Sequence, residues 1–201
     1  HEPYDLFYFK GTETVLYRDP KKRTAHVSFD GGLKWEVVKG PDGKMEGTAA
    51  VIWPHPYDSK RAYVLGEKGQ HWITTDQAET WKPFEIPARP MVTERGTLPL
   101  AFNGWDPAKV IYMGLDCSGF LGCMPKAWYT TDDFKTWNPL REMFYSCMWA
   151  AGTPEFGHDL DLSEKLGDRI LCVVPGLKGI MHSERLVFSD DYFQDSIDGT
   201  E

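Results

Sequence analysis

The 201-residue sequence predicts an all-β fold, specifically an Asp-box β-propeller, on three observations. A motif of the form Ser/Thr-x-Asp, followed by a Trp, recurs at intervals of roughly 45–60 residues, close to the length of one four-stranded propeller blade. The 19 glycines and 14 prolines divide the chain into short apolar runs, as all-β proteins require. Helix signals are nearly absent, and the one plausible helical turn, at Ser163–Leu166, is equally compatible with a loop.

The apolar runs have the usual strand length of about four to six residues. We expect strands at Leu6–Phe9, Thr14–Tyr17, Thr24–Phe29, Trp35–Val38, Ala49–Trp53, Ala62–Leu65, His71–Thr74, Val110–Met113, Ala127–Thr130, Ile170–Val174 and Arg185–Phe188. His71–Thr74 precedes the second copy of the motif, and the apolar run Trp81–Ile86 follows it. Each copy is therefore expected to form the turn of a β-hairpin.

The motif occurs in three full copies, at 28–35, 74–81 and 130–137, and in a degenerate copy at 189–193. We call these four segments the boxes. Their shared positions, which we expect to hold the turns together, are Ser28, Asp30, Gly32, Trp35, Thr74, Asp76, Trp81, Thr130, Asp132, Trp137 and Asp191. Because such boxes support a hairpin, they predict the fold and say little about function.

The spacing within a box has a physical reason. The hydroxyl and the carboxylate lie two residues apart at a strand end, where they can bond backbone groups that the turn leaves free. Gly32 suits the positive φ of a tight hairpin, whereas Ala78 and Phe134 replace glycine at about 1 kcal/mol each if φ stays positive. Lys34 replaces the hydroxyl residue that precedes Trp in the second and third boxes. The Trp is expected to pack between neighbouring blades.

The charge of the chain narrows the class of partner. Its net charge of −8 argues against nucleic acid, because phosphate binding needs a basic face. A basic peptide or protein ligand is compatible with this charge. No apolar run has the length of a transmembrane helix, and no signal peptide begins the chain. Neither absence decides the compartment, because His1 can follow a removed signal.

Four cysteines are present: Cys117, Cys123, Cys147 and Cys172. An even number fits two disulfides in a lumenal or secreted protein. Zinc is the competing interpretation, but it usually needs two cysteines separated by two to four residues, and the tightest pair here is separated by five. Disulfides are therefore favoured, and neither a metal nor a cofactor is expected.

No catalytic residue stands out. The paired acids Asp132-Asp133 and Asp190-Asp191 are the obvious candidates, but turn aspartates that face solvent are the commoner case. The six histidines form no metalloprotease motif, and no serine lies in a nucleophile elbow. Pro54-His-Pro56-Tyr-Asp58 and Trp105-Asp-Pro107 each precede a strand and are expected to be turns at equivalent blade positions.

The boxes, taken with the order of the cysteines, resemble the N-terminal part of the first Vps10 domain of fungal vacuolar sorting receptors, relatives of sortilin. The resemblance covers nearly the whole chain. It rests on Val15-Leu16-Tyr17, the boxes Val27–Trp35 and Trp72–Trp81, and then Cys117, Cys123, Lys126–Asp132, Cys147 and Ile170-Leu-Cys172. Boxes alone are less specific, since sialidases and xyloglucanases carry them too.

The resemblance implies a ten-bladed propeller in the lumen of the Golgi and endosomes, on a single-pass type I membrane receptor whose transmembrane span lies outside this chain. Its expected partners are protein or propeptide cargo, in particular vacuolar hydrolase precursors, and the remaining propeller blades of the same receptor. It also implies the disulfides Cys117–Cys123 and Cys147–Cys172. Residues 1–201 then form about four blades, an incomplete ring whose open edges suggest a fragment. No ligand-binding residue is transferred, because the family's best-known peptide contacts lie on later blades.

Three functions follow from these patterns. The first is a cargo-sorting receptor without catalysis, for which the histidines and acids motivate cargo release on acidification. The second is an Asp-box glycoside hydrolase, such as a sialidase or xyloglucanase. Sialidases need a three-arginine clamp and an Arg-Ile-Pro segment, whereas this chain has Arg169-Ile-Leu, and no carboxylate pair outside the boxes stands out. The third is an assembly propeller that acts through its rim.

Overall fold

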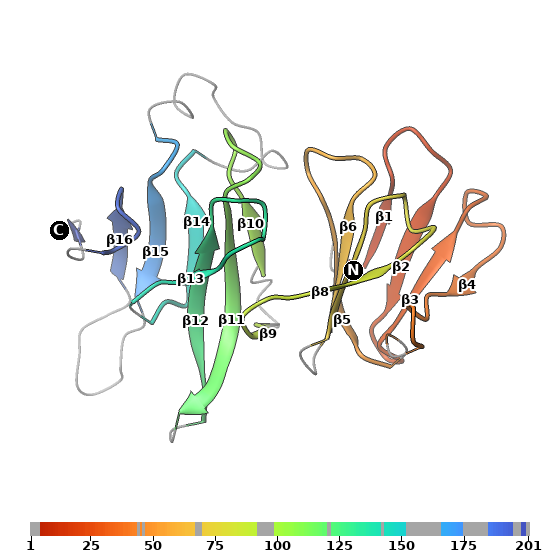
Figure 1. The fold of residues 1–201 in the computed structure, drawn as a ribbon, viewed down its shortest axis with the longest axis horizontal. Coiled ribbons are helices and arrows are strands. Elements are labelled where there is room, and N and C mark those ends of the chain that lie inside the picture. The colour runs from red at the N-terminus through yellow and green to blue at the C-terminus, as the bar shows by residue number, and fades with distance from the viewer. Residues whose placement is uncertain are drawn as a thin grey trace. The chain divides into compact units, whose positions relative to one another are not determined.

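The computed structural model describes residues 5–43, 45, 47–66, 70–91, 99–119, 122–141, 143–151, 166–174, 185–194 and 198–199. Every regular element in these ranges is a β-strand, so the all-β prediction is confirmed (Figure 1). The chain divides into two compact units, residues 1–92 and 93–201. The helical turn expected at Ser163–Leu166 lies outside the described residues, apart from Leu166.

The first unit holds two four-stranded antiparallel sheets, and in each sheet neighbouring strands follow one another along the chain. The first sheet consists of β1 (Leu6–Tyr8), β2 (Val15–Asp19), β3 (Thr24–Ser28) and β4 (Glu36–Val37). The second sheet consists of β5 (Ala49–Pro54), β6 (Ala62–Gly66), β7 (His71–Thr74) and β8 (Lys82–Phe84), and β9 (Arg89–Pro90) follows it.

The core of this unit lies between its two sheets. Alternate residues of β2 and β3 face the second sheet, and Leu16 and Val27 are opposite each other across that pair. From the second sheet, Ile52, Val64 and Trp72 complete the same buried cluster. Burying a large aliphatic side chain contributes about 1.5–3 kcal/mol, so this interface is the main source of stability in the unit.

The second unit repeats the arrangement. Its first sheet contains β10 (Leu100–Phe102), β11 (Val110–Gly119), β12 (Gly122–Thr130) and β13 (Asn138–Pro139), hydrogen-bonded in that order. Its second sheet contains β14 (Ser146–Trp149), β15 (Ile170–Val174), β16 (Arg185–Ser189) and β17 (Asp198–Gly199). We number the four sheets one to four along the chain.

The strands differ from the expected ones in two ways. β11 and β12 extend well beyond the predicted Val110–Met113 and Ala127–Thr130, because their pairing continues to Gly119 and Gly122. The first strands of the third and fourth sheets, β10 and β14, were not predicted, nor were the two-residue strands β9, β13 and β17. Both first strands are short, with three residues in β10 and four in β14, so the apolar run by itself is too brief to predict a strand.

Candidate functional site

One loop structure recurs after the first strand of every sheet. The first residue beyond that strand donates its N–H to the carbonyl of the last residue before the second strand. The four bonds are Phe9 to Thr14, His55 to Arg61, Asn103 to Lys109 and Ala150 to Arg169. They align the sheets residue by residue. Four residues that end the first strands are therefore counterparts of one another: Tyr8, Pro54, Phe102 and Trp149.

In the second sheet this loop is a turn held by a histidine. Nδ1 of His55 accepts the N–H groups of Tyr57 and Asp58, at 3.2 and 2.9 Å. The Asp58 carboxylate accepts the N–H of Lys60 and lies 3.8 Å from the Arg61 guanidinium. Since both bonds reach Nδ1, this nitrogen carries no proton and the imidazole is neutral.

The third sheet builds the same turn with an asparagine. Oδ1 of Asn103 accepts the N–H groups of Trp105 and Asp106, at 2.8 and 2.9 Å. Asp106 accepts the N–H of Ala108 and lies 3.9 Å from the Lys109 ammonium. The two segments that the sequence indicated as equivalent turns thus share their hydrogen bonds. Each exposes one aromatic side chain at the same place, 41% for Tyr57 and 49% for Trp105.

The second box shows the hydrogen bonds of a box turn. The Thr74 hydroxyl donates to Oδ1 of Asp76 at 2.8 Å, and it accepts the N–H groups of Asp76 and Ala78 at 3.4 and 2.9 Å. Oδ1 of Asp76 also accepts the N–H of Thr80 at 2.9 Å, and Oδ2 accepts the Thr80 hydroxyl at 2.5 Å. Both carboxylate oxygens are therefore engaged within the turn.

The other boxes repeat this pattern with small changes. In all of them the hydroxyl donates to the carboxylate two residues later, and the pairs are Ser28 with Asp30, Thr130 with Asp132, and Ser189 with Asp191. In the third box, Thr136 binds Asp132 through both its N–H and its hydroxyl. In the first box, Lys34 donates its N–H to Asp30 but has no hydroxyl to add.

Two consecutive residues with positive φ form each box turn. The pairs are Gly31 and Gly32, Gln77 and Ala78, Asp133 and Phe134, and Tyr192 and Phe193. Because φ is 72° at Ala78 and 67° at Phe134, the cost of about 1 kcal/mol for a non-glycine residue applies at both. Buried contacts offset it, since Ala78 lies in the core and the Phe134 ring contacts Phe102 at a centroid distance of 5.9 Å.

The three box tryptophans have different environments. Trp81 is buried in the core of the first unit. Trp137 is half-buried and packs on Tyr112 of its own sheet, with ring centroids 5.8 Å apart. Trp35 is 42% exposed; it contacts Tyr17 of its own sheet and donates its indole N–H to the Gly32 carbonyl. Packing between neighbouring sheets, expected for each Trp, is seen for Trp81, whose cluster contains residues of both sheets of the first unit.

The hydrogen bonds set the acidity of the box carboxyls. The side chain and backbone of Thr136, with the hydroxyl of Thr130, lower the pKa of Asp132 to about 2. The N–H of Lys34 and the hydroxyl of Ser28 lower the pKa of Asp30. At Asp76 partial burial raises the pKa, but the bonds from Thr80 and Thr74 outweigh it. The pKa of each of these three aspartates is thus lowered, whereas a carboxyl that acts as a general acid needs a raised pKa.

The structure contains two disulfides. Cys117 and Cys123 close the outer end of the long β11–β12 hairpin, six residues apart in sequence. Cys147 and Cys172 lie opposite each other on the paired strands β14 and β15, 25 residues apart, and are 5% and 1% exposed. The first links an exposed hairpin end, and the second links two strands within a buried face.

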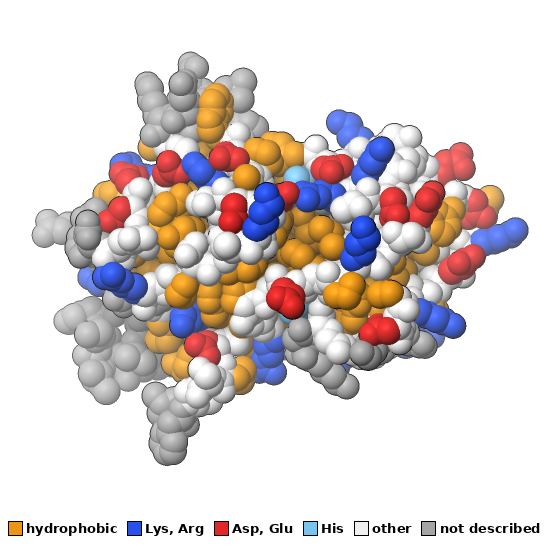
Figure 2. All heavy atoms as spheres, in the orientation of Figure 1, with side chains coloured by type: hydrophobic (Ala, Val, Ile, Leu, Met, Phe, Trp, Pro, Cys, Tyr) orange, Lys and Arg blue, Asp and Glu red, His pale blue; other side chains and the backbone are white. Residues whose placement is uncertain are grey.

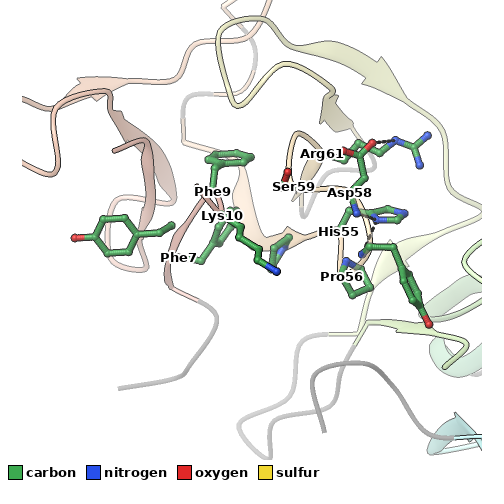
Figure 3. Close-up of a pocket in the computed structure, with 11 residues that line it drawn as sticks. Phe7, Phe9, Lys10, His55, Pro56, Asp58, Ser59 and Arg61 are labelled. Carbon is green, nitrogen blue, oxygen red and sulfur yellow. Dashed lines mark hydrogen bonds and ion pairs between the residues drawn. The ribbon is translucent and has the colours of Figure 1, made fainter. Parts of the chain in front are cut away.

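A cavity of about 530 Å³ opens between the first two sheets of the N-terminal unit. One side is formed by 7–10 at the end of β1, and the other by 54–59 and Arg61 of the β5–β6 loop. Figure 3 shows Phe7, Phe9 and Lys10 facing His55, Pro56 and Asp58 across this space. The lining thus combines apolar rings with two cations and one carboxylate.

The described part of the chain offers no metal centre, since its His, Cys, Asp and Glu side chains nowhere gather in groups of three or more. Nor does any described segment form a helix long and apolar enough to span a bilayer. Acidic and basic side chains alternate over the face shown in Figure 2 and form no continuous basic patch there.

The sequence has clear relatives. A family model described as sortilin, neurotensin receptor 3 (Sortilin-Vps10) matches residues 23–200. The vacuolar protein sorting/targeting protein 10 of Penicillium rubens is 60% identical over 99% of the chain, and that of Aspergillus fumigatus is 48% identical over 100%. The chain spans 13% of the length of each of these relatives.

The fold also resembles solved structures of much lower sequence identity. The GH74 xyloglucanase from Xanthomonas campestris matches 96% of the chain, and 29% of that enzyme, with a TM-score of 0.56 and 13% identity. The GH74 enzyme from Niastella koreensis matches with a TM-score of 0.53 and 11% identity. At these identities the likeness concerns the fold alone.

Proposed function

The chain belongs to the sortilin/Vps10 family, and from that premise we propose that it is part of the lumenal ligand-binding domain of a sorting receptor. In this proposal the receptor captures vacuolar hydrolase precursors in the Golgi and delivers them to the endosome and vacuole. The observation that carries it is the 60% identity, over 99% of the chain, to a protein named for vacuolar sorting and targeting. The receptor binds protein cargo and catalyses no reaction.

We further propose that residues 1–201 form the N-terminal portion of a Vps10 β-propeller of ten blades, with each described sheet as one blade and each box as its Asp-box turn. Four successive antiparallel sheets with the same loop and the same turn support this assignment. The first sheet also leaves the face away from the core open. Leu6, Tyr8 and Val37 on that face are 53%, 62% and 36% exposed. Another blade of the same receptor would cover such a face.

The disulfides support a lumenal location for this domain. Two cross-links, with no free cysteine among the described residues, are typical of proteins that mature in an oxidising compartment. We therefore place the domain in the Golgi and endosome lumen, with the single transmembrane span of a type I receptor outside this chain. The box residues and disulfides support the blades in this proposal, and none of them binds cargo or acts in catalysis.

The glycoside hydrolase alternative has weaker support. The likeness to the GH74 enzymes, at 11–13% identity, extends to the fold only. Glycoside hydrolysis needs two carboxyl groups placed across a substrate. The box aspartates are engaged within their turns, as Asp76 shows with both oxygens bonded to Thr80 and Thr74. No specific observation on this chain favours hydrolysis.

A sorting assay tests the proposal. The gene is deleted in the native fungus, and vacuolar hydrolase precursors are measured in the medium and in the vacuole. We expect the deletion to send precursors into the medium and the wild-type gene to restore sorting. A pull-down with the purified receptor at pH 7 should recover the same precursors, and recovery should fall at pH 5. Normal sorting in the deletion strain, with no precursor recovered at pH 7, would refute the receptor function.

A further inference from the structure

At the cavity between the first two sheets, one residue departs from the repeat. Aromatic residues end the first strand in three of the four sheets, as Tyr8, Phe102 and Trp149. The second sheet has Pro54 at this position, and Pro54 lines the cavity. The second sheet therefore lacks, at the edge of the cavity, the aromatic ring that the other three sheets have at this position.

The fourth sheet shows what fills the corresponding space. Trp149 is 1% exposed, and its indole N–H donates to the Ala101 carbonyl of the third sheet at 2.9 Å. The ring also meets Tyr192 edge-on, with centroids 6.3 Å apart. An indole at this position thus joins one sheet to the sheet before it through a hydrogen bond, and it packs on the box of its own sheet.

The same alignment identifies the groups that would receive an indole over Pro54. Ala101 is the next-to-last residue of β10, and its counterpart in β1 is Phe7, which borders the cavity. The Phe7 and Phe9 rings lie 5.3 Å apart on one side of the space, and Pro56 lies on the other (Figure 3). The volume of about 530 Å³ lies within the range of about 300–1,000 Å³ that is usual for ligand sites, and it exceeds one side chain.

We propose that this cavity binds an aromatic side chain, preferably Trp, of a cargo polypeptide. That the bound polypeptide is cargo rests on the proposed function. The ring occupies the space over Pro54 that Trp149 fills in the fourth sheet, and its N–H donates to the Phe7 carbonyl. Buried aromatic anchors of this kind contribute much of the binding energy at protein interfaces. Arg61 lies 3.8 Å from Asp58 in the same lining, which leaves Lys10 as the cation at the cavity that favours an acidic residue next to the aromatic one.

The probe is N-acetyl-L-tryptophanamide, which carries the ring between two peptide groups, and the protein is the natural protein that carries this chain. Saturation-transfer NMR measures binding, with N-acetyl-L-alaninamide as the reference compound. We expect transfer to the indole protons and a Kd on the order of 0.1–1 mM, given the small size of the probe. Indole transfer no greater than that to the alanine compound would overturn the proposal.

Two pairs of variants locate the site. In Pro54→Trp the protein's own indole should occupy the cavity and weaken probe binding about tenfold. Pro54→Ala adds no ring and should leave the affinity for the probe unchanged. Tyr57→Ala removes a ring from the lining and should weaken binding about threefold. Trp105→Ala, its counterpart on the third sheet, should change nothing. Circular dichroism checks that each variant is folded, and the Tyr57 pair decides the result if Pro54→Trp is not. Equal effects of Tyr57→Ala and Trp105→Ala would count against the cavity.

A cargo pull-down separates this inference from the proposed function. If the wild-type protein captures hydrolase precursors but binds no probe, the aromatic site is wrong and the receptor function stands. If the probe binds as described but no precursor is captured, the cavity is a real aromatic site and the receptor function fails. If both hold, Pro54→Trp should also reduce capture of the precursors that depend on this contact.

Discussion

The hydroxyl of Thr74 is the group on which the second box turn depends, and its removal should destabilise the first unit. Thr74→Val keeps the shape of the side chain, which is 1% exposed, and deletes only its hydrogen bonds. The Ala78 N–H then loses its acceptor at 2.9 Å, and Asp76 loses a donor at 2.8 Å. A buried N–H without a partner costs about 1–3 kcal/mol, and the bond to the carboxylate adds about 1 kcal/mol. We expect a loss of about 2–4 kcal/mol in the free energy of unfolding.

Thr74→Ser is the matched control. It keeps the hydroxyl and removes one methyl group, at about 1 kcal/mol. The first and fourth boxes already have serine at this position, namely Ser28 and Ser189. Thermal unfolding compares the variants, and a loss of 2–4 kcal/mol corresponds to a fall in Tm of roughly 5–15 °C. Amide hydrogen exchange at Ala78 should accelerate in Thr74→Val alone. A Thr74→Val variant as stable as Thr74→Ser would refute the reasoning, because the hydrogen bonds would then contribute nothing measurable.

Three further predictions follow from the same structure. Lys34→Thr gives the first box the hydroxyl that Thr80 and Thr136 provide in the second and third boxes. The pKa of Asp30, which is already lowered, should therefore fall further in an NMR titration. Lys34→Val, which adds no hydroxyl, should not have this effect. Replacing Cys147 and Cys172 together by serine should lower the free energy of unfolding by about 3–4 kcal/mol, and replacing Cys117 and Cys123 together should lower it by about 2 kcal/mol. The first loss is larger because that disulfide closes the longer loop. Chemical unfolding measures both losses, and equal losses would contradict the loop argument. Burial lowers the pKa of His71 to about 4, so as the pH falls the unfolded state takes up a proton on His71 before the folded state does. The free energy of unfolding should therefore fall by about 3 kcal/mol as the pH drops from about 6.5 to 4. Thermal unfolding of His71→Phe at pH 7 and pH 5 should show that this pH dependence is lost.

The hairpin turns were predictable because their chemistry is local. A hydroxyl, a carboxylate two residues later and a hydroxyl four residues beyond that form one closed set of bonds, as at Thr74, Asp76 and Thr80. Contacts inside seven residues need no partner from elsewhere in the chain. The strand before the second box was located for the same reason, since β7 (His71–Thr74) has the expected bounds.

Elements defined by distant contacts were not predicted. β10 and β14 are strands because β11 and β15 pair with them, and their own residues carry little strand signal. The environment of Trp35 is a similar case. Its box resembles the other boxes, yet the side chain is 42% exposed because it lies on the open face of the first sheet beside Tyr17. Which face of a sheet is covered depends on what packs against it.

The sequence by itself determined the all-β class, the repeating turn and the family, because the boxes and the cysteine order are written in short, contiguous motifs. The tertiary structure alone decided that Tyr8, Pro54, Phe102 and Trp149 are counterparts, since only the loop hydrogen bonds align segments of such different length. It also showed that Trp149 fills a space between two sheets while Pro54 borders an open one. The physical reason is that a cavity is a property of surfaces brought together by folding, and a single proline in a sequence gives no sign of the volume above it.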